Sequence, residues 1–131
     1  MLKVGIAGFG IVGQRRAKCV NSHPDLKLTA VCDKEYDQES TFDNGINCFN
    51  DYRNLLKEDL DILIVSMSND MATEVTIAGL ESGLHIFCEK PPARNLEEFM
   101  SVIEGEKKNP TLKLMYGFNH RHYESVQLIK Q

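Results

Sequence analysis

Short runs of apolar residues alternate along the chain with longer stretches in which apolar residues recur at helical spacing. The short runs are nearly continuous, as is typical of strands covered on both faces. They predict six strands, of which the third is the weakest: Leu2–Ala7, Leu28–Cys32, Ile46–Phe49, Ile62–Ser66, Ile86–Cys88 and Leu112–Phe118. The longer stretches predict helices over about Ile11–Ser22, from near Asn50, over about Asp70–Ser82, from Asn95, and over Tyr123–Gln131.

Two of the predicted helices carry residues that are typical of helix ends. Gly83 follows the third helix, where a glycine suits the left-handed C-terminal cap. Asn95 and Glu98 have the spacing of a capping box at the start of the fourth. Strands that alternate with helices indicate an α/β fold with right-handed crossovers. We therefore expect a doubly wound, mostly parallel sheet with helices on both faces and the strand order 3-2-1-4-5-6.

Composition narrows the functional classes. The chain has 131 residues and a net charge of −4, with no clustered basic face, which argues against a nucleic-acid partner. No apolar run approaches the roughly 18 residues of a membrane span, and the N-terminus lacks the pattern of a signal peptide. The four cysteines form no C-x-x-C pair, so we expect buried thiols in a reducing cytoplasm and no metal. They are Cys19, Cys32, Cys48 and Cys88.

A glycine pattern, G-x-G-x-x-G, directly follows the first predicted strand and opens the first helix. Its first glycine permits a tight turn, its second lets a pyrophosphate approach the backbone, and its third lets the helix pack closely. The pyrophosphate then lies on free N–H groups at the positive end of the helix. The cofactor-binding residues that this pattern predicts are Gly8, Phe9, Gly10, Ile11, Val12 and Gly13.

Asp33 lies twenty residues after Gly13, at the end of the second predicted strand. A carboxylate there accepts hydrogen bonds from the adenosine ribose hydroxyls. Its charge repels the extra phosphate of NADP, and Lys34 offsets part of that repulsion. We therefore expect a Rossmann fold that binds NAD in preference to NADP, with Asp33 and Lys34 at the ribose. A glycine turn that serves only packing, or a methyltransferase, are the other interpretations of this half.

The second half of the chain contains three motifs in order. Ala78–Gly83 precedes the fifth predicted strand, Glu89–Pro91 (Glu-Lys-Pro) follows it, and Tyr116–Arg121 (Tyr-Gly-Phe-Asn-His-Arg) ends the sixth. Together they resemble the Gfo/Idh/MocA family of oxidoreductases, named for glucose–fructose oxidoreductase and inositol dehydrogenase. The resemblance covers essentially the whole chain and argues against a methyltransferase.

The resemblance implies hydride transfer between NAD and a ring hydroxyl of a sugar, a sugar derivative or a cyclic polyol. It implies that Lys90 is catalytic and hydrogen-bonds the oxygen on the substrate carbon that exchanges hydride. Glu89 is expected beside the nicotinamide, and Asn119 near both the nicotinamide and the substrate. Arg121 is expected to anchor the substrate or the domain junction.

One loop departs from the family pattern. Many relatives carry Thr-Pro-Asn and then a histidine three residues later, whereas this chain has Met67-Ser68-Asn69 and then Ala72. We still expect Ser66, Met67 and Asn69 to contact the cofactor, largely through the backbone. The packing around the ribose and the substrate preference are expected to differ.

The length of the chain is the larger departure. Family members add a second α/β domain that supplies the substrate pocket and a histidine base. We expect residues 1–118 to form the nucleotide-binding domain and residues 119–131 to begin the connection to such a domain, through which the parent protein forms a homo-oligomer. His120 and His122 are too few for a zinc site. The alternative is a non-catalytic NAD-binding regulatory module.

Overall fold

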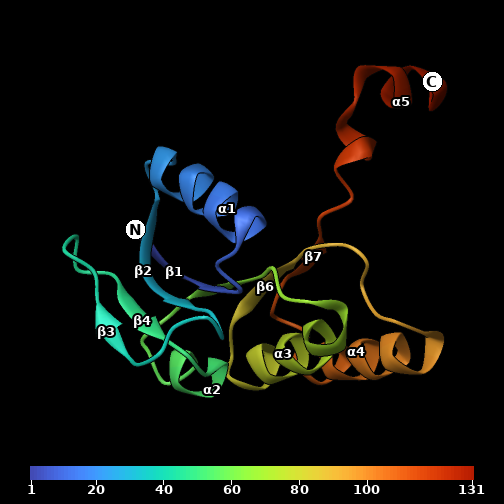
Figure 1. The fold of residues 1–131 in the computed structure, drawn as a ribbon. Coiled ribbons are helices and arrows are strands. Elements are labelled where there is room, and N and C mark those ends of the chain that lie inside the picture. The colour runs from blue at the N-terminus through green and yellow to red at the C-terminus, as the bar shows by residue number, and fades with distance from the viewer.

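A computed structural model describes residues 1–131 and contains one seven-stranded sheet (Figure 1). Its strands are β1 (Leu2–Ala7), β2 (Leu26–Cys32), β3 (Ser40–Thr41), β4 (Asn47–Phe49), β5 (Ile62–Val65), β6 (His85–Cys88) and β7 (Leu114–Tyr116). Their order is β3-β4-β2-β1-β5-β6-β7, and every pair is parallel except β3 with β4. The predicted order of six strands is therefore confirmed, with β3 added at one edge.

Two strand predictions differ from the structure by two residues at one end or both, and three others differ by a single residue. Strand β2 begins at Leu26, two residues earlier than expected, because its first residues pair with the start of β1. Strand β7 covers only Leu114–Tyr116 of the predicted stretch from residue 112 to residue 118. Leu112 is held in a turn by its N–H bond to the carbonyl of Asn109. The backbone leaves the sheet again after Gly117, whose N–H bonds the carbonyl of Cys88.

The helices cover the two faces of the sheet unequally (Figure 1). They are α1 (Ile11–Ser22), α2 (Tyr52–Leu55), α3 (Asn69–Glu81), α4 (Leu96–Lys108) and α5 (Glu124–Ile129), with a 3-10 turn at Asn119–His122. Helix α1 lies alone on one face, whereas α2 and α3 cover the other and α4 packs beside α3. No helix combines the length and the apolar character that crossing a bilayer demands.

Each face of the sheet has its own apolar core. Alternate residues of the strands point to opposite faces, so one strand contributes to both cores. Val75 and Leu80 of α3 pack on one face, and Ala17 and Val20 of α1 pack on the other. The residues that α3 turns toward the sheet are buried: Ala72, Val75, Thr76, Gly79 and Leu80.

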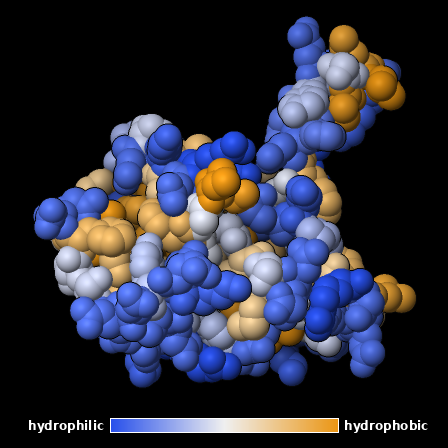
Figure 2. All heavy atoms as spheres, in the orientation of Figure 1, coloured by the Kyte–Doolittle hydropathy of each residue, from blue (hydrophilic) through white to orange (hydrophobic).

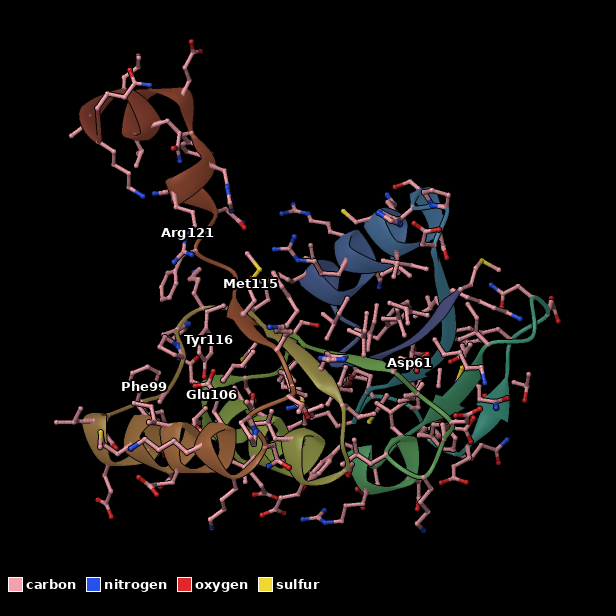
Figure 3. The ribbon with its side chains drawn as sticks, turned by 180° about the vertical axis from the view of Figure 1, so that it is seen from behind. Asp61, Phe99, Glu106, Met115, Tyr116 and Arg121 are labelled. Carbon is pink, nitrogen blue, oxygen red and sulfur yellow. The ribbon has the colours of Figure 1, made fainter.

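The α1 face is covered over only part of its width. Ile6, Ile64, Phe87 and Met115 lie in register across β1, β5, β6 and β7, so their side chains form one row on this face. Ile6 at the centre is fully buried, whereas Met115 at the edge is 45% exposed. Figure 3 shows Met115 on the opposite side of β7 from Tyr116, which lies over α4. The sheet therefore keeps an apolar strip beyond the reach of α1.

Both predicted helix ends are present, but at one of them a hydrogen bond has a different partner from the one expected. Gly83 has φ +80°, the left-handed conformation expected of a C-terminal cap. The Asn95 side chain accepts the N–H of Glu98 at 2.9 Å, as in a capping box. The Glu98 carboxylate, however, accepts the backbone N–H of Arg94 instead of that of Asn95, and it pairs with the Arg94 guanidinium.

The conformation of Gly83 generates a stability prediction. An added Cβ at Gly83 meets nothing within 4 Å, so the cost of Gly83→Ala is conformational rather than steric. We expect this change to lower the free energy of unfolding by about 1–2 kcal/mol, the penalty of a left-handed alanine. Urea denaturation followed by circular dichroism measures it.

Gly105→Ala is the matched control. Gly105 lies inside α4, and its added Cβ would make only ordinary contacts, at 3.6 Å from Leu80 and 3.9 Å from Ile77. Alanine in a helix interior should raise the free energy of unfolding by up to about 1 kcal/mol. Equal effects of the two substitutions would contradict the conformational explanation.

Candidate functional site

The glycine loop joins β1 to α1 through two close backbone approaches. Gly8 has φ +91°, and a Cβ there would lie 2.4 Å from the carbonyl oxygen of Ser66. A Cβ on Gly13 would lie 2.0 Å from the carbonyl oxygen of Gly8. Both distances are far inside van der Waals contact, so only glycine allows the helix to start this close to the strand.

Gly10 differs from the other two glycines, because a Cβ there would meet nothing within 4 Å. The space above it is open, and Gly10 supplies no side-chain cap to α1. The N–H groups of the first helical turn have no intrahelical partner and carry the positive end of the helix dipole. This arrangement fits the pyrophosphate of a dinucleotide.

A groove of about 170 Å³ lies over this loop at the carboxyl ends of β1, β2 and β5. It brings together six of the residues predicted for cofactor binding: Gly8, Gly10, Asp33, Lys34, Ser66 and Met67. Ile11 and Val12 of the same loop are exposed. Asn69 is the first residue of α3 and is also exposed, but it does not line the groove.

Asp33 is fixed by the backbone on both sides of its carboxylate. One oxygen accepts the N–H of Phe9 at 2.7 Å and the other accepts the N–H of Glu35 at 3.0 Å. An ionised carboxylate has about four lone-pair sites, so capacity for two ribose hydroxyls remains. On the other side of the loop, Ser66 Oγ donates to the carbonyl of Gly8 at 2.7 Å. Asp33 and Ser66 therefore hold the loop as well as border the groove.

A second pocket, of about 370 Å³, opens beyond β6 and β7. Its lining residues are Lys90, Gly117, Phe118, Asn119 and His120. The structure thus brings the predicted pair Lys90 and Asn119 to one pocket, where the side chain of Lys90 is exposed. The Lys90–Pro91 peptide bond is cis. His120 lines the same pocket, and it stacks on the ring of Tyr123 with centroids 4.9 Å apart.

Glu89 forms an ion pair that the sequence did not predict. Its partner is Arg16, whose Nε donates to a carboxylate oxygen of Glu89 from the second turn of α1. The Arg16 guanidinium also lies over the ring of Phe87, 5.0 Å from its centroid. The only signal in the sequence was the position of Arg16, one turn after Gly13 and therefore on a similar side of the helix.

Arg121 lies on the segment that follows β7, next to His120 of the Lys90 pocket. It belongs to the 3-10 turn that follows β7, and its guanidinium lies 6.0 Å from the ring centroid of Phe118. Figure 3 shows it on the segment that leads away from the sheet toward α5. It lines neither the glycine-loop groove nor the Lys90 pocket.

The cysteines near the site are not activated as nucleophiles. Burial, together with the neighbouring charge of Asp33, raises the pKa of Cys32 to about 12. Burial also raises the pKa of Cys88, while the neighbouring hydroxyl of Thr76 acts in the opposite direction. Both residues therefore stay protonated near neutral pH and serve packing rather than nucleophilic chemistry. No group of three or more His, Cys, Asp or Glu side chains is gathered around a potential metal position.

Sequence relatives match nearly the whole of this chain but are themselves much longer. The inositol 2-dehydrogenase of Salmonella typhimurium (strain LT2) is 31% identical over 135 residues, which is 98% of this chain and 40% of the relative. The D-glucoside 3-dehydrogenase of Escherichia coli (strain K12) is 30% identical, over 99% of this chain and 38% of the relative. The chain therefore spans about 40% of the length of these curated relatives.

Solved structures share the fold. The myo-inositol 2-dehydrogenase of Lactobacillus plantarum superimposes with a TM-score of 0.82 and 26% identity, over 98% of this chain and 40% of that one. The scyllo-inositol dehydrogenase of Lactobacillus casei, solved with NAD(H) and scyllo-inositol, superimposes with a TM-score of 0.85 at 22% identity. It covers 100% of this chain and 40% of that one, and it supports the fold alone.

The family assignment rests on the match to a sequence profile. The profile of the Gfo/Idh/MocA family, described as an oxidoreductase family with an NAD-binding Rossmann fold, matches residues 2–118. These residues contain the glycine loop, Asp33, the Glu89–Lys90 pair and the whole sheet. The chain belongs to the Gfo/Idh/MocA oxidoreductases and comprises their NAD-binding Rossmann fold.

Proposed function

We propose that this chain is the cofactor-binding part of a dehydrogenase that oxidises or reduces a ring carbon of a sugar, a sugar derivative or a cyclic polyol. The observation that carries the proposal is the position of the two pockets. The glycine-loop groove and the Lys90 pocket both open at the carboxyl ends of the parallel strands, the first over β1, β2 and β5 and the second over β6 and β7. This is the edge where doubly wound sheets bind dinucleotides and their substrates.

The residues have separate roles in this proposal. When bound, NAD supplies the group that takes up or releases hydride. The backbone N–H groups at the start of α1 hold the pyrophosphate, and Asp33 accepts hydrogen bonds from the adenosine ribose. The Lys90 ammonium hydrogen-bonds the substrate oxygen and stabilises the negative charge that develops on it. Asn119, in the same pocket, orients the substrate or the carboxamide of the nicotinamide.

We also propose that residues 119–131 lead into a second domain, which encloses the substrate and contributes the base. The greater length of the relatives supports this arrangement. A second support is the exposed apolar surface around α5, where Leu128 is 61% and Ile129 is 85% exposed. Figure 2 shows this apolar tip on the segment that projects from the body. Exposed apolar surface of this kind marks an interaction site.

The dehydrogenase proposal is favoured over a non-catalytic regulatory module, because the relatives are named as enzymes and because Lys90 lies in a pocket instead of in a surface ion pair. Assembly of the parent protein into a homo-oligomer through the second domain remains part of the proposal. So does a cytoplasmic location, which rests on the four cysteines, all of them unpaired.

Lys90 provides the test of activity. In the protein that carries this domain together with its substrate domain, Lys90→Ala should lower kcat about 100-fold or more, the scale of losing one positioned polar group. Steady-state rates with NAD and a panel of inositols and glucosides measure it. The 131-residue chain alone should bind NADH without turnover, because its Lys90 pocket cannot align a substrate from one side. An unchanged kcat in the variant would contradict the role of Lys90.

Gly10 provides the test of cofactor placement. Gly10→Val should abolish NADH binding without unfolding the protein, because its side chain would occupy space that the fold leaves open. Gly13→Val should unfold or strongly destabilise the domain, because its side chain would meet the carbonyl of Gly8. Fluorescence titration with NADH and thermal unfolding separate the two effects. Normal NADH affinity in folded Gly10→Val would place the cofactor elsewhere.

Asp33 provides the test of cofactor preference. The chain should bind NADH more tightly than NADPH, because the fixed carboxylate repels a 2′-phosphate. Asp33→Ser should narrow that preference by about tenfold, a change of about 1.4 kcal/mol in the difference of binding free energies. Isothermal titration calorimetry with both dinucleotides is the measurement. Equal or tighter binding of NADPH by the unaltered chain would transfer the dominant role to Lys34.

A further inference from the structure

The ion pair between Arg16 and Glu89 joins the phosphate-binding helix to the strand that carries the proposed catalytic lysine. Arg16 comes from α1, and Glu89 directly follows β6 and precedes Lys90. The two side chains are only 24% and 15% exposed, respectively, whereas the surface pair of Lys3 and Asp59 is 45% and 86% exposed. Charges that are mostly buried are screened less by solvent and salt than charges at the surface. This pair is therefore screened less than the pair of Lys3 and Asp59.

Three features of the surroundings place Glu89. Its own backbone N–H donates to the carbonyl of Val65 at 2.9 Å, which fixes the chain at the end of β6. A Cβ on Gly117 would lie 2.7 Å from one carboxylate oxygen, so this glycine gives the carboxylate its room. Arg16 holds the other oxygen and is itself held against the ring of Phe87. Arg16 is the only side chain that forms a hydrogen bond with the Glu89 carboxylate.

The position of this pair matters because of where the fold places the two ends of a dinucleotide. Asp33, at the end of β2, marks the adenosine side of the glycine loop. A dinucleotide that crosses the loop at the switch point between β1 and β5 carries its nicotinamide toward the ends of β5, β6 and β7. Glu89 lies at the end of β6, within that nicotinamide half.

The charge of the nicotinamide differs between the two redox states. The ring is cationic in NAD⁺ and neutral in NADH. A fixed carboxylate in the nicotinamide half favours the cationic ring, and a guanidinium paired with that carboxylate opposes the preference. The net charge of the Arg16–Glu89 pair therefore affects the affinity of the domain for NAD⁺ relative to NADH.

We propose that Arg16 is a positioning residue that holds and neutralises Glu89, so that the pair sets the ratio of NAD⁺ affinity to NADH affinity. The proposal rests on the proposed function, because it assumes that the glycine-loop groove binds a dinucleotide. It concerns the redox state that the domain prefers, which the glycine loop and Asp33 do not distinguish.

The experiment measures dissociation constants of the 131-residue chain for NAD⁺ and for NADH by calorimetry. Arg16→Met removes the charge but keeps an apolar stem against Phe87, and it should shift the ratio toward NAD⁺ by about threefold to tenfold. A tenfold shift corresponds to about 30 mV in the potential of a bound two-electron couple. Glu89→Gln should shift the ratio in the opposite direction. The double variant should lie near the unaltered chain.

Two further variants separate a local effect from a general one. Arg15→Met removes the same charge from the neighbouring position of α1, where the side chain is exposed and forms no ion pair, and it should leave the ratio unchanged. Arg16→Lys retains the charge and should restore most of the original ratio. ADP-ribose, which lacks the nicotinamide, should bind all variants equally, which shows that the loop and the fold are intact.

The outcomes distinguish the inference from the function on which it rests. An unchanged ratio in Arg16→Met, or an equal shift in Arg15→Met, with ADP-ribose still bound, overturns the role of the pair and leaves the dinucleotide site in place. Failure of the unaltered chain to bind ADP-ribose, NAD⁺ and NADH overturns the proposed function and the inference with it.

Discussion

The close approach of α1 to the end of β1 is the constraint on which the rest of this structure depends. Gly13 lies against the carbonyl of Gly8, at a separation that leaves no room for a side chain. This contact fixes where α1 begins and therefore where its free N–H groups point. The same placement presses Ala17 and Val20 onto the sheet and brings Arg16 within reach of Glu89. One backbone contact thus determines a core, a candidate phosphate site and an ion pair across the sheet edge.

The unequal cover of the two sheet faces follows from how the strands are connected. A helix between β2 and the next parallel strand would lie beside α1 in a regular doubly wound fold. Here the connection from Asp33 to Ile46 contains only the short antiparallel strand β3. Toward the other edge, α3 and α4 both lie on the face opposite α1. The α1 face is left with an apolar strip at Phe87 and Met115, the side from which the projecting α5 departs.

The features that the sequence predicted well are those whose cause is local. Continuous apolar runs predicted the parallel strands, because a strand buried on both faces needs apolar residues at every position. Gly83 and Asn95 predicted helix ends, because each acts on its own backbone. The spacing of the three glycines predicted the loop, because each glycine acts on the backbone of the loop itself.

The features that escaped prediction depend on residues that are distant in the sequence. Arg16 and Glu89 are 73 positions apart, and no local pattern links them. The two-residue strand β3 exists only because β4 offers it an edge. The carboxylate of Glu98 accepts the N–H of Arg94 nearby, but it also accepts the hydroxyl of Thr73 from α3, 25 positions earlier. Lys90 and Asn119 were assigned to one site through the resemblance to a family, and the pocket that joins them forms only when β6 and β7 are adjacent.

The geometry of the sheet edge divides the work between this chain and the domain that we propose to follow it. The groove for the adenosine and pyrophosphate is built from the ends of β1, β2 and β5, all of which belong to this chain. Affinity for the cofactor is therefore expected to reside here. The Lys90 pocket is bounded by this chain mainly through β6, β7 and the turn after them, and the polar side chains that line it are those of Lys90, Asn119 and His120. In the proposed function these few groups contact the oxygen of one ring carbon, so we expect the discrimination between one polyol and another to come from the second domain. The names of the relatives agree with this division. The part that matches this chain occurs in an enzyme named for inositol and in one named for a glucoside.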